Sequence, residues 1–276
     1  MALSALMAMP AYASDPAPVS VEVLQGWELS DGRRVAAIKL SLEDGWKTYW
    51  RAPGDSGIPP LFSWKGARNI GQMQITWPQP KVFDDGGVRS IGYKEQLVIP
   101  LHIAPKRDGQ PIRLKGRMDI GACSDICVPY TLKFDTKLEE AGTFPTPEIA
   151  SALASAPFSA SEAGVKSATC RLTPTDDGMQ IEARVTVPPA GGREETVIEA
   201  GQGTIWVSEP LTTRKGGQLV AVSQMFHSSG TAFSVNLSLC ASQFWGLTTL
   251  LIFAVVAPAK PRGVCVMRRS ESPAQV

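Results

Sequence analysis

The sequence predicts an all-β protein with two β-domains, and three observations support this prediction. Apolar and polar residues alternate along many short segments, which is the period-two pattern of half-buried strands. Asp-Gly and similar turn residues separate these segments. Helical periodicity does not appear between them. We therefore expect an immunoglobulin-like β-sandwich over residues 18–140 and a second, smaller β-domain over residues 165–239.

The composition is that of a globular protein with enough apolar residues for a core in each domain. The chain has 276 residues, of which 43% are hydrophobic. Its 27 basic and 26 acidic side chains give a formal net charge of +1. We expect no nucleic-acid partner, because nucleic-acid binding requires a basic surface that this balance does not indicate.

The first residues indicate export. Residues 1–17 contain a short apolar run, the small-x-small cleavage pattern Ala11-Tyr12-Ala13, and then a polar, Pro-rich start. We interpret this segment as a signal-peptide remnant and leader. A positively charged beginning is missing, so we expect the first Met to lie inside a longer signal peptide. The alternative is a disordered N-terminus that is rich in Ala and Met.

Three alternating series predict strands before the two cysteines of the first domain. They comprise Val19, Val21 and Val23 with Trp27 and Leu29; Ala36, Ile38, Leu40 and Leu42; and Leu97, Ile99, Leu101 and Ile103. Turns bound these series at Asp31-Gly32, Asp44-Gly45, Asp85-Gly86-Gly87 and Asp108-Gly109. We interpret the nearby aromatic residues as sandwich core and not as a ligand platform. These residues are Trp46, Tyr49, Trp50, Trp64 and Trp77.

Two cysteines lie between two further strand patterns. Alternation runs over residues 112–120 and resumes over residues 130–134, with Cys123 and Cys127 between them. If the chain ran straight through the pair, the two Cα atoms would be roughly 13 Å apart, about twice the reach of a disulfide. A short loop at 124–126 between antiparallel strands brings the thiols face to face. The sequence thus predicts a hairpin whose end carries a reversible dithiol/disulfide pair.

The residues beside the pair bear on its reactivity. Asp119 and Asp125 are close in sequence, and no Lys or Arg occurs between Arg117 and Lys133. Nearby carboxylates disfavour a thiolate, so we expect them to raise the thiol pKa. The pair would then react slowly with random oxidants and mainly inside a docked complex.

Other roles for the pair stay open. It is a structural disulfide in one alternative, and in another it binds a soft metal such as Cu(I) beside Met118 or His102. A zinc site is weaker, because the chain has only two histidines, His102 and His227. For the redox role we expect neither a cofactor nor a metal. The pairing of three further cysteines is not predicted, namely that of Cys170, Cys240 and Cys265.

The chain beyond the first domain divides into three parts. Residues 141–164 are rich in Ala, Ser, Pro and Thr, and we interpret them as a linker in which Thr146 caps a short helix over residues 147–153. Alternation then restarts in the second domain, over residues 179–187, 205–207, 219–222 and 233–239. Residues 240–276 contain an apolar segment and a basic tail.

The C-terminal segment has two interpretations. A bilayer crossing needs ~20 apolar residues, and residues 237–258 reach this length only by including several polar side chains. If residues 237–258 were inserted into a bilayer, they would anchor the protein in the inner membrane with its basic tail in the cytoplasm. The alternative is a buried strand followed by a disordered or frameshifted tail.

Three motifs appear in a fixed order along the first domain. Residues 45–60 begin Gly-Trp-Lys-Thr-Tyr-Trp, residues 77–93 run from Trp-Pro-Gln-Pro to Ile-Gly-Tyr, and residues 123–129 read Cys-Ser-Asp-Ile-Cys-Val-Pro. Together they resemble the N-terminal periplasmic domain of the thiol:disulfide interchange protein DsbD family, particularly its suppressor-of-copper-sensitivity relatives. Residues 165–225 resemble, more loosely, the second β-segment of those relatives.

The resemblance implies a periplasmic domain of the protein-disulfide reductase type. Such a domain takes electron pairs from a membrane-embedded DsbD-type donor domain and passes them to periplasmic thioredoxin-fold oxidoreductases. By the same resemblance, Cys127 forms the mixed disulfides and Cys123 resolves them. A mobile cap loop over residues 83–93 would shield the pair, with candidate residues Phe83, Asp84, Asp85 and Tyr93. Cytochrome c biogenesis and copper tolerance are the cellular contexts that the resemblance implies.

Two departures from the family's pattern limit what the resemblance predicts. Only three residues separate the cysteines, which is closer than in the best-known members. The family also continues into a multi-span membrane domain, whereas the tail after about residue 225 fits no part of the pattern. We therefore expect a truncated or frameshifted product that exchanges disulfides without completing a transmembrane relay alone. The alternative is a copper-binding or purely structural exported β-module with a permanent disulfide.

Overall fold

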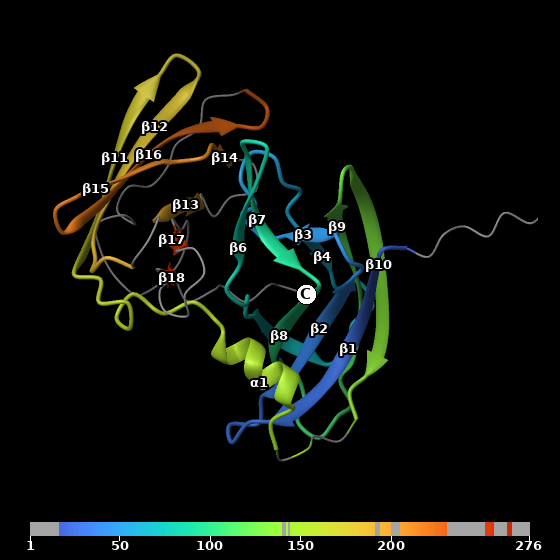
Figure 1. Cartoon of the computed structure of the whole chain (residues 1–276). Helices are drawn as coiled ribbons and strands as arrows, with labels where there is room; N and C mark the ends of the chain where they lie inside the picture. The colour runs from blue at the N-terminus through green and yellow to red at the C-terminus, as the bar shows by residue number, and fades with distance from the viewer. Residues whose placement is uncertain are drawn as a thin grey trace, which may run out of the picture.

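The computed structural model describes residues 17–139, 142, 144–190, 194–199 and 205–230, and the backbone of residues 252–256 and 264–266. Nearly all of the elements are strands, which confirms the predicted all-β class (Figure 1). The first domain contains β1 (Val19–Glu28), β2 (Arg34–Leu42), β3 (Lys47–Tyr49), β4 (Leu61–Ser63), β5 (Ile70–Ile75), β6 (Lys81–Asp85), β7 (Val88–Lys94), β8 (Gln96–Pro105), β9 (Arg113–Cys123) and β10 (Cys127–Lys137).

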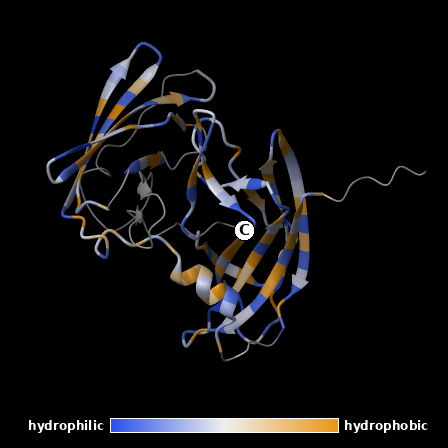
Figure 2. Ribbon diagram, in the orientation of Figure 1, coloured by the Kyte–Doolittle hydropathy of each residue, from blue (hydrophilic) through white to orange (hydrophobic). Residues whose placement is uncertain are grey.

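The first domain is a sandwich of two antiparallel sheets. One sheet has the order β1-β2-β8-β5, and the other has the order β10-β9-β3-β7-β6 with β4 beside β9. The apolar positions that predicted the strands, such as Ile38, Leu101 and Ile120, are buried between the sheets. Burial of this apolar surface, worth roughly 25 cal/mol per Å², holds the two sheets together. Figure 2 shows the alternating hydropathy along these strands.

A helix, α1 (Pro147–Ala154), covers the outer face of the first sheet. Its buried residues Ile149 and Ala152 pack against Val35 and Ala37 of β2. Strand β2 is therefore buried on both faces, although its alternation predicted a half-buried strand. The segment expected to be a linker thus contains a helix that packs on the first domain.

The predicted helix is confirmed, but the predicted side-chain cap at Thr146 is wrong. Thr146 is the N-cap residue and Pro147 occupies the first turn, yet no side-chain hydrogen bond caps the helix. The Thr146 hydroxyl instead donates to the Gln25 carbonyl of β1 at 2.8 Å. Packing of α1 against the sheet brings this carbonyl within reach, and the hydroxyl ties the helix start to the sandwich.

The remaining elements form two sheets in the region that is expected to be a second β-domain. They are β11 (Ser167–Thr175), β12 (Gly178–Thr186), β13 (Glu195–Glu199), β14 (Ile205–Val207), β15 (Leu211–Lys215), β16 (Gln218–His227), β17 (Ile252–Val256) and β18 (Val264–Val266). One sheet has the order β11-β12-β16-β14, with β15 also paired to β16, and a small sheet has the order β13-β17-β18. Its own core includes Ile181, Val185 and Met225.

Several sequence predictions fall on residues outside the described ranges. These are the signal-peptide remnant, the series over residues 233–239 and most of residues 240–276. Of the candidate span over residues 237–258, only β17 is described, and it pairs with β13. Among the described residues, no helix has the length and apolar character needed to cross a membrane.

An exposed charge cluster on the first domain predicts a pH effect on stability. Arg113 Nε and Lys115 Nζ of β9 lie 2.6 and 3.0 Å from Asp135 of β10. Hydrogen bonds from Arg113 and then Lys115 lower the pKa of Asp135 to about 2, from an unfolded value of 3.8. The stabilisation is therefore complete above the unfolded pKa and is lost as the pH falls through the folded pKa.

We expect Asp135→Asn to lower the unfolding temperature slightly at neutral pH, because the cluster is exposed and screened by solvent. The difference from the wild type should shrink strongly as the pH falls to about 2, where the aspartate is half protonated in the folded state and almost fully protonated in the unfolded state. Thermal unfolding from pH 7 down to pH 2, about the acid limit, measures this convergence. A difference that stays constant with pH would contradict the assignment.

Candidate redox site

The two cysteines lie at the end of the β9–β10 hairpin. Cys123 ends β9, Cys127 begins β10, and the two are direct partners in the antiparallel register. Their Cα atoms are 4.1 Å apart and their sulfurs form a disulfide. The Ser124 N–H donates to the Ile126 carbonyl at 3.1 Å and closes the loop. The predicted hairpin and its paired thiols are confirmed.

The two cysteines differ sharply in exposure. Cys123 is 1% exposed, whereas Cys127 is an exposed residue. Cys123 ends β9, which lies between β3 and β10 in the sheet, whereas β10 is the edge strand. An incoming thiolate therefore reaches Cys127 more easily than Cys123, because exchange requires access along the disulfide axis.

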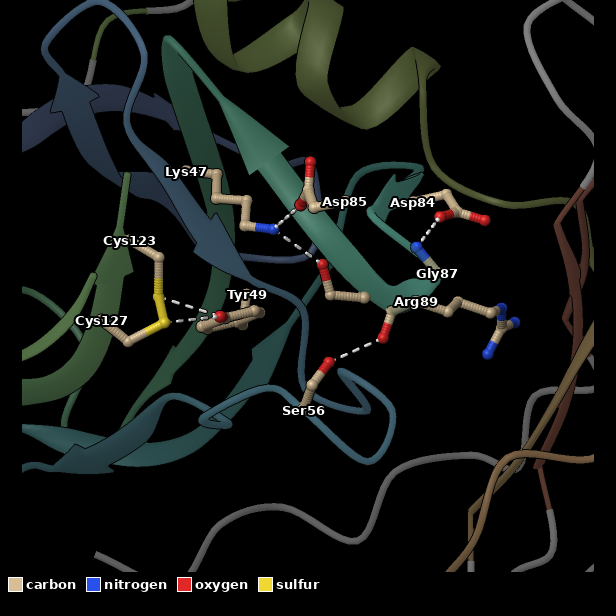
Figure 3. Close-up of polar contacts among 10 residues, drawn as sticks. Lys47, Tyr49, Ser56, Asp84, Asp85, Gly87, Arg89, Cys123 and Cys127 are labelled. Carbon is tan, nitrogen blue, oxygen red and sulfur yellow. Dashed lines mark hydrogen bonds and ion pairs between the residues drawn. A yellow bond between two sulfur atoms is a disulfide. The ribbon is translucent and has the colours of Figure 1, made fainter. Parts of the chain in front are cut away.

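Tyr49 contacts both sulfurs of the disulfide (Figure 3). Its hydroxyl oxygen lies 2.9 Å from Cys123 Sγ and 3.2 Å from Cys127 Sγ. Burial, and then the negative charge of Asp85, raise the pKa of the Tyr49 phenol. The phenol therefore keeps its proton at neutral pH and can donate it in a hydrogen bond to sulfur.

Tyr49 is expected in the sandwich core from the sequence, and its contact with the sulfurs is not predicted. The residue is indeed buried, but it lies at the end of β3, next to the cysteine strand. The contact joins residues that are 74 positions apart, so local patterning does not reveal it. The sequence signal that could have indicated a role for Tyr49 at the site was the family motif over residues 45–60, which contains this residue.

The sheet register places part of the predicted cap on the same face as the disulfide. Directly paired residues in a sheet point to the same side. Lys47 of β3 pairs with Cys123 and with Lys94 of β7, and Phe83 and Asp85 follow on the neighbouring strand β6 in the same alternation. Instead of a loop, this segment is the β6–β7 hairpin, whose turn residues Gly86 and Gly87 both have positive φ.

The other two predicted cap residues lie elsewhere. Asp84 Oδ1 accepts a hydrogen bond from the Gly87 N–H at 2.9 Å and so stabilises the turn of the hairpin. Tyr93 is buried in the core, where it stacks on Trp77 and donates to the Pro78 carbonyl at 2.8 Å. The structure therefore brings Phe83 and Asp85 to the disulfide face, but not Asp84 or Tyr93.

A basic side chain that the local sequence did not indicate also lies on this face. Lys47 forms an ion pair with Asp85 (Figure 3). It also donates to Ser90 Oγ at 3.0 Å and lies 5.5 Å from the centre of the Phe83 ring. The Asp85 carboxylate thus has a counter-charge beside it, and the pKa of Asp85 is lowered, first by its hydrogen bond with Lys47.

The two carboxylates predicted to modulate the pair lie at different distances from it. Asp125 is exposed in the hairpin turn between the cysteines. Asp119 lies four positions before Cys123 on β9, accepts a hydrogen bond from the Thr131 hydroxyl at 2.6 Å, and lies 3.3 Å from Arg117. These partners offset its charge. The effect of both carboxylates on the thiols stays a prediction.

The side chains considered for a copper site do not join the pair. Met118 is buried in the sandwich core on the opposite face of β9 from Cys123, since their positions differ by an odd number. His102 lies on β8 in the other sheet. Within the part of the chain that the structure describes, no group of three or more His, Cys, Asp or Glu residues could hold a metal ion.

The hairpin disulfide and its sandwich agree with a comparison to known families. A family model described as the N-terminal domain of the thiol:disulfide interchange protein DsbD matches residues 17–139. The first domain belongs to this family. The match covers all ten strands of the sandwich and both cysteines, so the DsbD N-terminal domain of this chain is assigned to thiol–disulfide exchange at a general level.

The arrangement of the whole chain is also known from a solved structure. The chain is similar to the N-terminal periplasmic domain of ScsB from Proteus mirabilis, with a TM-score of 0.63 and 20% sequence identity. The similarity covers 96% of this chain and 97% of that chain. At this identity the similarity shows the fold alone. No curated protein matches the chain significantly.

Proposed function

We propose that this chain is a periplasmic thiol–disulfide exchange protein that relays reducing equivalents through Cys123 and Cys127. Its donor would be a membrane-embedded DsbD-type domain, and its acceptors would be periplasmic thioredoxin-fold oxidoreductases. The main observation in support is an exposed Cys127 joined to a buried Cys123, with the Tyr49 hydroxyl in reach of both sulfurs. Similarity to a domain described as periplasmic supports the compartment.

Reduction of the site begins at the exposed sulfur. A donor thiolate attacks Cys127 Sγ, the bond between Cys127 and Cys123 breaks, and a mixed disulfide with the donor forms. Cys123 leaves as a thiolate, to which the Tyr49 hydroxyl donates a hydrogen bond before solvent supplies a proton. The second thiol of the donor then displaces Cys127. Two electrons have passed, the donor dithiol is now a disulfide, and both cysteines are reduced.

Delivery reverses these steps on a second protein. The Cys127 thiolate attacks an acceptor disulfide and forms a mixed disulfide, and one acceptor thiol leaves. The Cys123 thiolate then attacks Cys127 Sγ and releases the second acceptor thiol, which regenerates the internal disulfide. Cys123 needs no access to solvent for this step, because its target is the neighbouring sulfur across the hairpin end.

The surface around Cys127 suits a protein partner. Ile126 in the turn is 67% exposed, and Leu61, which pairs in register with Asp119 on the cysteine face, is 63% exposed. Large exposed apolar side chains beside a reactive group are typical of a docking site, because they lose their contact with water when the partner binds. The β6–β7 hairpin would be the cover, held at Lys47 by Asp85 until a partner docks.

The reduction potential of the pair tests this function against a permanent structural disulfide. Equilibration of the purified chain in glutathione buffers, followed by alkylation and mass measurement, gives the reduced fraction. We expect a potential above about −300 mV, the limit below which structural disulfides resist reduction by glutathione. A lower value would favour the structural module, and tight binding of Cu(I) by the reduced pair would favour the copper-binding alternative.

A further inference from the structure

The two domains meet through ion pairs that are largely shielded from water. Arg89 of β7 lies 3.2 Å from Glu195 of β13 and 3.4 Å from Glu209, and the Arg89 and Glu195 side chains are 7% and 10% exposed. A second pair joins Arg51 to Glu199 at 3.2 Å. The first domain therefore presents arginines and the second domain presents glutamates at the contact.

Arg89 belongs to the strand that supports the redox site. Its side chain points away from the disulfide, whereas its carbonyl accepts a hydrogen bond from the Ser56 hydroxyl at 2.7 Å (Figure 3). The next residue, Ser90, accepts the hydrogen bond from Lys47, which is the register partner of Cys123. Residues 89 and 90 of β7 thus connect the contact between the domains to Lys47 on one side of the site and to the loop that contains Ser56 on the other.

The loop held by Arg89 also reaches the cysteine strand. Ser56 lies in the segment between β3 and β4, and Ile58 of this segment fills the space beside Gly121, two positions before Cys123. A Cβ at Gly121 would lie 2.8 Å from Ile58 Cβ, so the two chains are in tight contact. The Pro53 carbonyl of the same segment accepts a hydrogen bond from the Ile91 N–H at 2.9 Å.

We propose that the second β-domain is a positioning element for the redox pair. Its glutamates hold Arg89, and Arg89 fixes the strand and the loop that keep Tyr49 against Cys123 and Ile58 against Gly121. This inference rests on the proposed exchange function, because it explains how Cys123 stays protected while Cys127 is free to react. Arg89 is a positioning residue and does not touch the sulfurs.

The physical reason is the cost of an unpaired buried charge. Removal of the partner glutamates leaves the Arg89 guanidinium shielded from water without a counter-charge, which is strongly unfavourable. The domain contact must then open so that water can reach Arg89. Strand β7 and the loop over residues 50–60 lose a support on that side, and Cys123 becomes accessible.

Selective alkylation of the reduced full-length chain tests the proposal. After reduction with dithiothreitol, a limiting pulse of iodoacetamide labels the thiols. Trypsin leaves Cys123 and Cys127 in one peptide between Arg117 and Lys133, so fragment ions must locate the label. In the wild type we expect Cys127 to be labelled much faster. In the Glu195→Gln, Glu209→Gln double variant, we expect labelling of Cys123 relative to Cys127 to rise about tenfold through local opening.

The chain offers a matched control within the second domain. Glu194 is also 10% exposed at its side chain, and it pairs with Arg214, which belongs to the same domain. Glu194→Gln should leave the labelling ratio unchanged. Arg89→Lys keeps a cation between the glutamates and should preserve the wild-type ratio, whereas Arg89→Met should raise it. If the double variant does not fold, the single variant Glu209→Gln can take its place in the labelling experiment, because Glu209 is partly exposed.

Two outcomes overturn the proposal: a wild-type ratio in the folded glutamate variants, or an equal rise in Glu194→Gln. The readout needs no partner protein and no turnover. A potential typical of a structural disulfide would therefore overturn the proposed function while leaving this test of positioning intact.

Discussion

Cys123→Ser should capture a thioredoxin-fold partner as a stable mixed disulfide, and Cys127→Ser should capture almost none. Cys127 is exposed and attacks the partner, whereas Cys123 is buried and serves to release it. Without the resolving thiol the mixed disulfide persists, and we expect about a hundredfold more of it than with Cys127→Ser. Non-reducing electrophoresis and mass spectrometry of chains purified from an exporting host measure the yield.

Cys170→Ser is the control for this experiment. Cys170 lies on β11 of the second domain, so its replacement should leave capture by Cys123→Ser unchanged. Equal capture by both active-site variants would contradict the assignment of Cys127 as the attacking residue. Absence of capture in both would contradict the exchange function and favour the binding-module alternative.

Tyr49→Phe should make the pair a weaker oxidant. The hydroxyl is within hydrogen-bond distance of both sulfurs, and a hydrogen bond to a charged sulfur is worth more than one to a disulfide. Loss of about 1.5–3 kcal/mol from the reduced thiolate form corresponds to a potential more negative by about 30–60 mV. Glutathione equilibration at a pH where the reduced pair carries a thiolate measures the shift.

Tyr93→Phe is the matched control for Tyr49→Phe. It removes another buried tyrosine hydroxyl, but that hydroxyl donates to the Pro78 carbonyl inside the core. We expect Tyr93→Phe to lower the unfolding temperature and to leave the potential unchanged, because it does not contact sulfur. Equal shifts of the potential in both variants would show that Tyr49 acts through general stability.

Features that depend on near neighbours could be predicted from the sequence. The alternation over residues 112–120 and 130–134 places successive side chains on opposite faces, and a turn between them must pair Cys123 with Cys127. The helix over residues 147–153 was predicted in the same way, because Pro at its first position fits helical φ. The family resemblance rested on the motifs around these elements.

Features that depend on packing could not be predicted. The burial of both faces of β2 requires α1, which begins more than a hundred positions later in the chain. The Thr146 hydroxyl donates to the Gln25 carbonyl, 121 positions away in the chain, and does not cap its own helix. Similarly, no basic residue lies close to the cysteines in the sequence, whereas Lys47 of β3 lies beside Cys123 in the folded sheet.

Side-chain alternation and the spacing along one strand pair are enough to predict the class of fold, the hairpin and the identity of the two sulfurs. The packing of distant strands sets which sulfur is exposed, brings Tyr49 to both sulfurs, and pairs Arg89 with Glu195 behind the site. These properties arise from contacts between strands far apart in the chain, whose order in the sheet the local pattern does not specify.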